Sequence, residues 1–204
     1  MDEETPIVYI VDDDEAVCRS LSLLIQDVGL DVQTFNTAED FLAAYDPAQP
    51  GCLVADMRMP GMSGIELQHQ LVEQGISLPC IVITGHGDVP MAVEAMKAGV
   101  VDFVEKPFRH QHLLDNVQKA LQIDARARRR RIRETDIETK TSSLTAREKD
   151  IMTLLTNGKS SKTISYELGI SQKTVDFHRA HILQKMAVDS VVELILLFRE
   201  PQLA

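Results

Sequence analysis

Acidic and phosphate-binding side chains recur at the ends of apolar, strand-like runs in the first half of the chain. They are Asp12 and Asp13 after 7–11, Asp56 after 52–55, Thr84 after 80–83 and Lys106 after 102–105. The carboxyl ends of parallel strands meet at one edge of an open sheet, where ligands bind. We therefore expect these five side chains to form one site, although about ninety positions separate the first from the last.

The chemistry of such a site follows from its charges. Three carboxylates held close together repel one another unless a cation lies among them. Magnesium, or manganese in its place, suits an all-oxygen site because it accepts one or two carboxylates together with phosphate oxygens. An aspartate can be the nucleophile that takes up a phosphoryl group. Metal and lysine would neutralise the phosphoryl oxygens, and the threonine hydroxyl would donate to one of them. The set predicts a phosphorylation switch.

Four motifs around these residues resemble the receiver domain of two-component response regulators. They are IVDDDE at 10–15, DMRMPG at 56–61, TGHGD at 84–88 and DFVEKPF at 102–108. The stretch at 84–99, TGHGDVPMAVEAMKAG, is most similar to the FixJ type. The resemblance implies a doubly wound, flavodoxin-like α/β domain with five parallel strands.

The resemblance also assigns roles to single residues. It implies that Asp56 is the phosphoacceptor and that Asp12 and Asp13 hold magnesium, with the backbone carbonyl of Arg58 as a further ligand. Lys106 matches the phosphate-binding lysine. For the neighbouring Asp14 we expect a helix N-cap or a solvated charge, and solvation is also the alternative interpretation of the other acids at 12–13, because acids are common near helix starts.

Residues Thr84 and Phe103 match the family's switch pair. Phosphorylation would add about 1.5 to 2 negative charges at Asp56 and draw Thr84 inward, so that Phe103 turns into the vacated space. That change would remodel the face of the fourth helix, fifth strand and fifth helix, which the resemblance makes a dimer surface. The candidate residues of this face are Val93, Lys97, Val101 and Leu113.

The order of elements supports an α/β fold. Strands are predicted at 7–11, 31–35, 52–55, 80–83 and 102–105. Helical spacing of apolar residues, with capping signals, predicts helices at 17–28, 38–44, 63–75, 88–98 and after Pro107. Strands that alternate with helices form a parallel sheet covered on both faces.

Negative charge is concentrated in the first part of the chain. The 204 residues carry a net charge of −10. Residues 1–122 carry −14, residues 123–143 carry +3 and residues 144–204 carry +1. A strongly acidic domain repels nucleic acid, so DNA contacts are expected from the remainder. We expect a receiver at 1–122, a charged helical linker at 123–143 and a second domain at 144–204.

Arginines dominate the linker, at positions 126, 128–131 and 133. Apolar periodicity fails there, while Ala, Arg and Glu favour helix. One interpretation is a solvated extension of the last receiver helix. The alternative is a segment that steers or contacts phosphates, which would make DNA binding steeply salt-dependent.

The second domain is expected to be all-α, with four helices. Their signals are a Thr145/Glu148 capping box, a start at Ser160 or Ser161, the N-cap Ser171 before 172–186, and a Ser190/Glu193 box. The second and third helices, joined by a short glycine-containing turn, form a helix-turn-helix whose later helix enters the major groove.

Motifs in this domain resemble the LuxR-type output domain of NarL/FixJ response regulators. They are LTARE at 144–148, GKS at 158–160, KTI at 162–164, LGIS at 168–171, TV at 174–175, HR at 178–179 and KM at 185–186. Ser161 and Ser165 replace the usual asparagine and alanine of the scaffold helix. The resemblance implies DNA contacts from Lys162, Lys173, Thr174, Asp176, Phe177, Arg179, Ala180 and Lys185.

These contacts would differ in kind. The basic side chains can neutralise phosphates, while Thr174 and Phe177 could contact a thymine methyl. Asp176 could accept from a cytosine amino group or repel phosphates. An alternative for Phe177 is packing against the neighbouring helix. His178 is expected to cap or to donate to a phosphate rather than to bind a metal.

The combined expectation is a cytoplasmic, phosphorylation-activated transcriptional regulator rather than an enzyme. Its three cysteines lack CxxC spacing, no apolar run approaches the ~18 residues of a membrane span, and the acidic start is unlike a targeting segment. The expected partners are a sensor histidine kinase, double-stranded promoter DNA, a second copy of the phosphorylated chain and RNA polymerase, without a membrane. Dimers would place two helix-turn-helix domains about one DNA turn apart.

Other functions fit less well. A metal-dependent aspartyl-phosphate phosphohydrolase would use Asp12 and Asp14 as a DxD pair, but Glu15 opens a helix where that plan needs a different loop. An esterase would need GxSxG spacing, which residues 61–64 do not have. A binder of RNA would need aromatic stacking surfaces, and the chain has no Trp and only 3 Tyr.

Overall fold

The computed structural model of the chain describes residues 5–85, 93 and 95–198. Two compact units follow one another along the chain, Met1–Arg129 and Arg130–Ala204. The first contains a five-stranded sheet, and the second is made of helices.

A parallel sheet forms the centre of the first unit. Its strands are β1 (Ile7–Val11), β2 (Asp31–Phe35), β3 (Gly51–Asp56), β4 (Cys80–Thr84) and β5 (Asp102–Glu105). Their order is β2-β1-β3-β4-β5, and every neighbouring pair is parallel. This is the flavodoxin-like order of doubly wound sheets, so the predicted fold class is confirmed. The sequence placed all five strands, and β3 and β4 extend to include Asp56 and Thr84 themselves.

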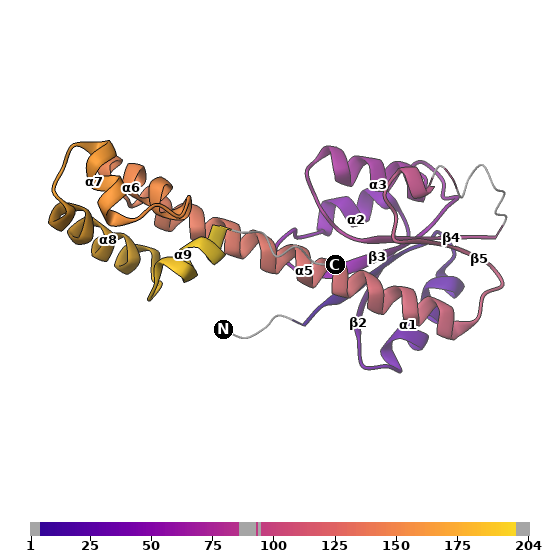
Figure 1. Ribbon diagram of the computed structural model, residues 1–204. Coiled ribbons are helices and arrows are strands. Elements are labelled where there is room, and N and C mark those ends of the chain that lie inside the picture. Colours follow the sequence, from indigo (N-terminus) through magenta and orange to yellow (C-terminus); the bar gives the residue numbers. More distant parts are fainter. Residues whose placement is uncertain (1–4, 86–92, 94, 199–204) are drawn as a thin grey trace. The chain divides into compact units, whose positions relative to one another are not determined.

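Helices cover both faces of this sheet (Figure 1). On one face lie α1 (Glu15–Gln26) and the first part of α5 (His110–Ser142); on the other lie α2 (Ala38–Ala44) and α3 (Gly64–Glu73). Each face has its own buried cluster. Residues that alternate along β1 and β3 supply both clusters, which is why these strands read as unbroken apolar runs.

Local capping signals fix where the helices of the first unit begin. Asp14 is the N-cap of α1, and its Oδ1 accepts from the Ala16 N–H at 2.7 Å. Ser63 and Glu66 form the predicted capping box at α3. Of the helix expected at 88–98, residues 88–92 and 94 lie outside the described residues, while 93 and 95–97 are helical.

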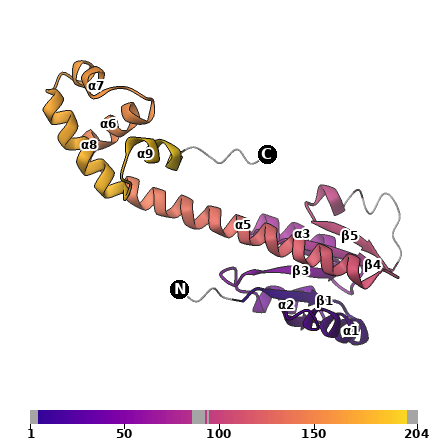
Figure 2. The ribbon, with the colours of Figure 1, turned by 60° about the horizontal axis from the view of Figure 1, so that its bottom comes forward.

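The helix α5 is 33 residues long and runs without a break through the arginine-rich segment (Figure 2). Its first part presents a stripe of buried residues to the sheet, and this stripe ends at Asp124. The helical form expected for residues 123–143 therefore extends as far as Ser142.

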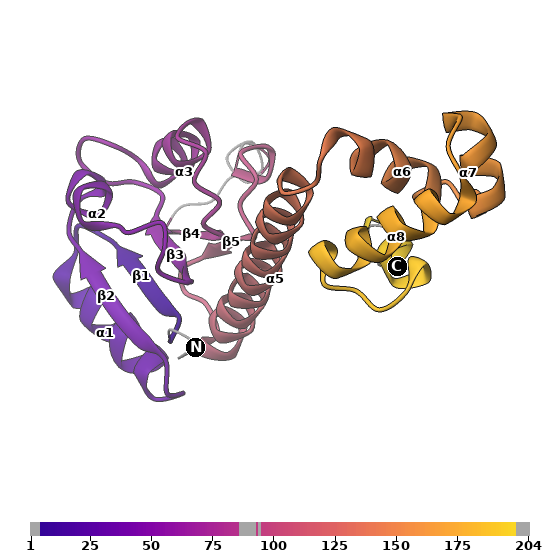
Figure 3. The same ribbon diagram turned by 90° about the vertical axis from the view of Figure 1, so that its left-hand side faces the viewer.

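Four further helices make up the second unit, as predicted (Figure 3). They are α6 (Ala146–Thr156), α7 (Ser161–Leu168), α8 (Gln172–Met186) and α9 (Val191–Phe198). Apolar side chains from all four form one buried cluster. Gly169 ends α7 with a φ of +63°, a left-handed conformation that glycine adopts at little cost, and α8 begins three residues later at Gln172.

Candidate functional site: a phosphoacceptor site and a helix-turn-helix

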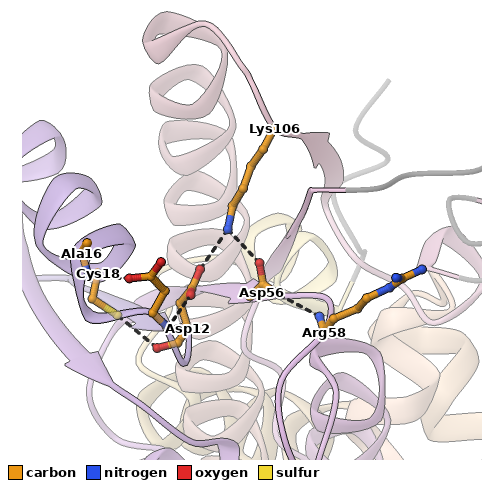
Figure 4. A network of polar contacts seen from close by, with 7 residues as sticks. Asp12, Ala16, Cys18, Asp56, Arg58 and Lys106 are labelled. Atoms are coloured by element: carbon orange, nitrogen blue, oxygen red, sulfur yellow. Dashed lines mark hydrogen bonds and ion pairs between the residues drawn. The ribbon is translucent and has the colours of Figure 1, made fainter.

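Two carboxylates and a lysine meet at the carboxyl edge of the sheet (Figure 4). The Lys106 ammonium lies 3.0 Å from Asp12 Oδ2 and 2.8 Å from Asp56 Oδ1. Asp12 follows β1 and Asp56 ends the adjacent strand β3, whereas Lys106 follows β5, which is two strands away from β3. The long lysine side chain therefore reaches past the end of β4 to join them. The strand-end prediction is confirmed for these three residues.

The Asp56 carboxylate is fixed from two sides but stays accessible. Its Oδ1 accepts from Lys106, and its Oδ2 accepts from the backbone N–H of Arg58 at 2.7 Å. The side chain is 11% exposed, so a small donor can reach it. Gly64, at the start of α3, allows this helix to approach the strand closely, because an added Cβ would lie 2.4 Å from the Asp56 carbonyl oxygen.

Asp12 is more deeply buried than Asp56. Its side chain is 4% exposed, and its Oδ1 accepts from the Asp14 N–H at 2.9 Å. Burial raises the pKa of Asp12, although hydrogen bonds from the Asp14 backbone and from Lys106 oppose the shift. Burial alone would lower the pKa of Lys106, but its hydrogen bonds to both carboxylates outweigh this and raise it. The lysine is therefore held in its charged form between two acids.

The remaining predicted receiver residues lie around this centre in different surroundings. Thr84 ends β4, is 1% exposed and accepts with its backbone oxygen from the Lys106 N–H at 2.7 Å. Phe103 on β5 is half-buried and packs against the cluster on the α2 and α3 face. These positions are compatible with the switch pair, whose movement stays a prediction.

Asp13 does not join the other two carboxylates. It is exposed, and within the described residues no group of three or more His, Cys, Asp or Glu side chains is gathered as a metal site. The three acids are therefore not gathered in this arrangement: Lys106 offsets only one of the two negative charges of Asp12 and Asp56, so a third carboxylate beside them would be repelled. The buried carboxylate of Asp12 and the partly buried carboxylate of Asp56 still have the chemistry that a hard divalent cation prefers.

The four residues expected on the dimer face are not equally exposed. Val93 is 47% exposed, Lys97 is exposed and Val101 is half-buried. Leu113 is fully buried in the cluster beneath α1 and α5, so its assignment to a surface is wrong. Its apolar side chain faces the sheet because α5 covers that face.

Most of the predicted DNA-contacting residues lie on the exposed side of α8. Val175 and Ile182 are fully buried in the helical cluster. Exposed side chains on the same helix are Lys173, Asp176, Phe177, Arg179 and Ala180, while Thr174 is half-buried and hydrogen-bonds Ser171; Lys162 is exposed on α7. The helix-turn-helix thus presents a mixed basic and apolar surface.

The Phe177 ring is 58% exposed, and its ring contacts are with histidines of its own helix. Its centroid lies 4.2 Å from that of His181 and 5.8 Å from that of His178. Packing against the neighbouring helix would bury this ring, whereas more than half of it is exposed. The tilted pair of Phe177 and His181 presents an apolar edge at the surface that the sequence assigned to base contact.

One predicted phosphate contact has another role. The Lys185 ammonium lies 2.7 Å from Glu148 Oε2 and also donates to the Ser143 carbonyl at 3.4 Å. Glu148 is buried, with 4% of its side chain exposed, and accepts from the Thr145 N–H at 2.8 Å. Lys185 thus neutralises a buried carboxylate inside the domain, and its assignment to DNA phosphates is not supported. The capping box revealed Glu148 in the sequence but not its ionic partner.

Comparison with known proteins agrees with both sites. Residues 8–118 match the response regulator receiver domain family, and residues 142–198 match the luxR family of bacterial regulatory proteins. The first match covers more than half of the chain and contains the complete Asp12, Asp56 and Lys106 site. The chain belongs to the response regulators with a LuxR-type regulatory domain. Members of this architecture are transcriptional regulators of two-component systems and not enzymes.

Curated relatives of this response regulator match it over nearly its whole length. The response regulator protein TodT of Pseudomonas putida is 42% identical over 195 residues, which cover 96% of this chain and 86% of TodT. The transcriptional regulatory protein FixJ of Azorhizobium caulinodans is 43% identical over 195 residues, with 96% and 92% covered.

Solved structures of response regulators also resemble this one. The response regulator StyR matches with a TM-score of 0.86 at 47% identity, over 95% of this chain and 98% of StyR. Full-length FixJ from B. japonicum matches with a TM-score of 0.59 at 40% identity, over 95% and 96%. Among the described helices of this response regulator, none is long and apolar enough to cross a bilayer.

Proposed function

We propose that Asp56 accepts a phosphoryl group from the phosphohistidine of a sensor kinase, and that this modification strengthens binding of the second unit to promoter DNA. The observation that carries the proposal is the bridge from Lys106 to Asp12 and Asp56, in a chain that also contains an exposed recognition helix. DNA as the target places this activity in the cytoplasm.

The transfer uses the carboxylate of Asp56 as nucleophile. A carboxylate oxygen forms the new P–O bond while the P–N bond of the donor histidine breaks, and the imidazole leaves with its electron pair. Little covalent chemistry is asked of the protein, so catalysis rests on positioning and on charge stabilisation. The Lys106 ammonium, already within 2.8 Å of Asp56 Oδ1, is placed to stabilise the equatorial phosphoryl oxygens.

A divalent cation completes the proposed site. Asp12, Asp13, Asp56 and the Arg58 carbonyl are the residues that would hold it. When bound, Mg²⁺ or Mn²⁺ supplies the positive charge that allows a dianionic phosphoryl group to approach the acids. The burial that raises the pKa of Asp12 disfavours an unpaired carboxylate there, and a cation offsets that cost.

Removal of divalent cations tests this part of the proposal. EDTA is expected to stop phosphoryl uptake from acetyl phosphate, and added MgCl₂ is expected to restore it, because Lys106 alone offers one positive charge to two carboxylates and a phosphoryl group. Intact-protein mass spectrometry measures the uptake. A full mass increase in EDTA would contradict a metal-dependent reaction.

The kinase would dock beside the site. An open groove of about 390 Å³ lies next to Lys106, between α1 and the segment that joins β5 to α5. Its lining is mostly apolar and includes Val17, Leu24 and Phe108. A partner that delivers a phosphohistidine to Asp56 has to contact the surface around the carboxylate, and this groove offers apolar area there.

Phosphorylation is proposed to act on DNA binding through dimerisation. Thr84 would donate to the new phosphoryl group and Phe103 would repack, which would change the surface around Val93, Lys97 and Val101. Two copies would then present their α8 helices to half-sites about one turn apart. RNA polymerase is the proposed further partner at the promoter.

The DNA surface is tested by replacing one of its lysines. Lys173→Ala is expected to weaken binding to duplex DNA about tenfold and to reduce the slope of log affinity against log salt by about 1, as for loss of one phosphate contact. Fluorescence anisotropy at several salt concentrations measures both values. Lys149→Ala, at an exposed position of α6, is the matched control and should leave the slope unchanged. Equal effects of the two variants would remove Lys173 from the interface.

The whole function is tested by selecting duplexes from random DNA with and without acetyl phosphate. The expected result is a single enriched motif with two half-sites, selected more strongly after phosphorylation. Enrichment that does not depend on phosphorylation would contradict the proposed switch, whereas no enrichment under either condition would contradict DNA recognition.

A further inference from the structure

A buried carboxylate and a half-buried arginine form an ion pair in α5, beyond residue 118, where the match to the receiver family ends. Asp124 is 3% exposed and occupies the last position of the stripe that α5 presents to the sheet. A carboxylate at a core-facing position is costly unless it is paired. Its partner is Arg128, one turn later, whose Nε lies 2.8 Å from Asp124 Oδ2.

The pair does more than neutralise itself: Arg128 also binds the loop that leads from α2 into β3, and Asp124 binds the first residue of β3. Asp124 Oδ2 accepts from the Gly51 N–H at 2.9 Å. The guanidinium of Arg128 donates to the Ala48 carbonyl at 2.7 Å and to the Gln49 carbonyl. Three consecutive donors of one planar group are thus used, an arrangement that only arginine provides.

The loop that is held in this way cannot easily move away from the sheet. An added Cβ at Gly51 would lie 2.1 Å from the Ile7 carbonyl oxygen, and the Ile7 N–H donates to the Pro50 carbonyl at 2.9 Å. The end of the loop at Pro50 and the first residue of β3 are therefore packed directly on β1. Burial raises the pKa of the Tyr45 phenol, and the charge of Arg128 is the largest opposing influence, which places the guanidinium beside this loop residue too.

Gly51 is the first residue of β3, and Asp56 is the last. The strand that carries the phosphoacceptor is therefore hydrogen-bonded at its opposite end to the part of α5 assigned to the linker. In the second unit, Arg133 of the same arginine run donates to the carbonyls of Leu196 and Leu197 at 3.3 and 3.2 Å. Each unit thus holds one arginine of the run through a pair of backbone carbonyls.

We propose that Asp124 and Arg128 form a clamp that makes residues 123–129 part of the receiver, and that this clamp positions α5 so that phosphorylation at Asp56 is communicated to the DNA-binding unit. In this proposal Arg128 belongs to the receiver, whereas the sequence assigned the arginine run either to a solvated extension of the last receiver helix or to a segment that steers or contacts phosphates. The communication part rests on the proposed function, whereas the clamp itself does not.

Amide hydrogen exchange on the full-length protein tests the clamp directly. Residues 123–129 are expected to exchange as slowly as the receiver part of α5, and Arg128→Ala is expected to speed their exchange, together with that of loop 46–50, at least about tenfold. Arg129→Ala removes the same charge from a neighbouring exposed position and should leave both segments unchanged. Unaltered exchange in Arg128→Ala would overturn the clamp.

A second measurement separates positioning from stability. Arg128→Ala and Arg128→Lys are both expected to take up a phosphoryl group from acetyl phosphate at the wild-type rate, but the gain in DNA affinity on phosphorylation should fall about fivefold. Lysine keeps the charge beside Asp124 but cannot hold two carbonyls at once. Asp124→Asn keeps an acceptor for Gly51 and should give an intermediate loss.

The possible outcomes distinguish the communicating role of the clamp from the proposed function. A full affinity gain in both Arg128 variants would overturn the communicating role. If phosphorylation gave the wild-type chain no gain in DNA affinity, the proposed function and the communicating role would both fail. The exchange experiment would still decide whether residues 123–129 belong to the receiver.

Discussion

Asp56→Asn is expected to take up no phosphoryl group from acetyl phosphate and to show no phosphorylation-dependent dimerisation. The asparagine amide keeps the size of the side chain and an acceptor for the Arg58 N–H, but it has no nucleophilic carboxylate. Intact-protein mass spectrometry measures the uptake, and sedimentation velocity with acetyl phosphate measures dimerisation. The wild-type chain should gain one phosphoryl group and sediment faster.

Asp14→Asn is the matched control for this experiment. It makes the same chemical change two residues from Asp12, and asparagine is as good an N-cap as aspartate. Because the Asp14 side chain caps α1 through the Ala16 N–H, and its backbone N–H to Asp12 is kept in the variant, Asp14→Asn should respond to acetyl phosphate as the wild type does. An unaltered sedimentation shift in Asp56→Asn would contradict the assignment of this residue as the phosphoacceptor.

The sequence was sufficient to predict the centre of this site because local signals place each residue at a strand end. Once the strands before Asp12, Asp56 and Lys106 are recognised, the geometry of a parallel sheet brings their carboxyl ends together. No knowledge of distant contacts is needed. The same reasoning predicts position but not side-chain direction, and it therefore placed Asp13 in the cluster although the structure leaves it exposed.

The predictions failed where an apolar or charged residue has two plausible neighbours. Leu113 suits a dimer face and a core equally well by its type, and only the packing of α5 on the sheet decides between them. Lys185 suits a phosphate and a buried acid, and its actual partner Glu148 lies 37 positions earlier. Asp124 was counted as a linker charge, although its spacing from Val117 and Ala120 already put it on the buried stripe of the helix.

Asp124 also shows why a domain boundary inferred from composition differs from one defined by contacts between residues. The change in charge and the loss of apolar periodicity place the start of the linker at residue 123. The contacts between residues, in contrast, place the end of the first unit at Arg129. The difference comes from a few polar contacts, which periodicity does not detect. Polar residues that belong to a domain through hydrogen bonds look like linker in a sequence.

The second large effect is expected in the DNA-binding unit, from loss of the buried carboxylate of Glu148. Its Oε2 accepts from Lys185 at 2.7 Å and from the Thr145 N–H at 2.8 Å, so one side chain joins the start of α6 to the end of α8. Glu148→Ala removes a capping interaction and leaves the lysine without its partner. We expect a loss of about 2 to 3 kcal/mol in the free energy of unfolding of this unit, measured by urea denaturation.

Glu193→Ala provides the control for this change. Glu193 takes part in a comparable box at α9, where its carboxylate accepts from the Asp189 N–H at 2.9 Å, but it is exposed and is not paired with a lysine in the described contacts. Its loss should cost about 1 kcal/mol or less, as expected for a cap alone. Equal losses in the two variants would mean that the ion pair with Lys185 contributes nothing beyond capping.

The same pair predicts how stability depends on pH. The hydrogen bond and charge of Lys185, together with the Thr145 N–H, lower the pKa of Glu148 from 4.5 to about 2. The folded unit therefore binds this proton less readily than the unfolded chain does, so the contribution of Glu148 is complete above about pH 4.5 and is lost as the pH falls towards 2. Urea denaturation of Glu148→Gln, which cannot ionise at this position, should show a shallower decline over this range than the wild type. Parallel declines for the two proteins would show that other carboxylates govern the acid sensitivity of the unit.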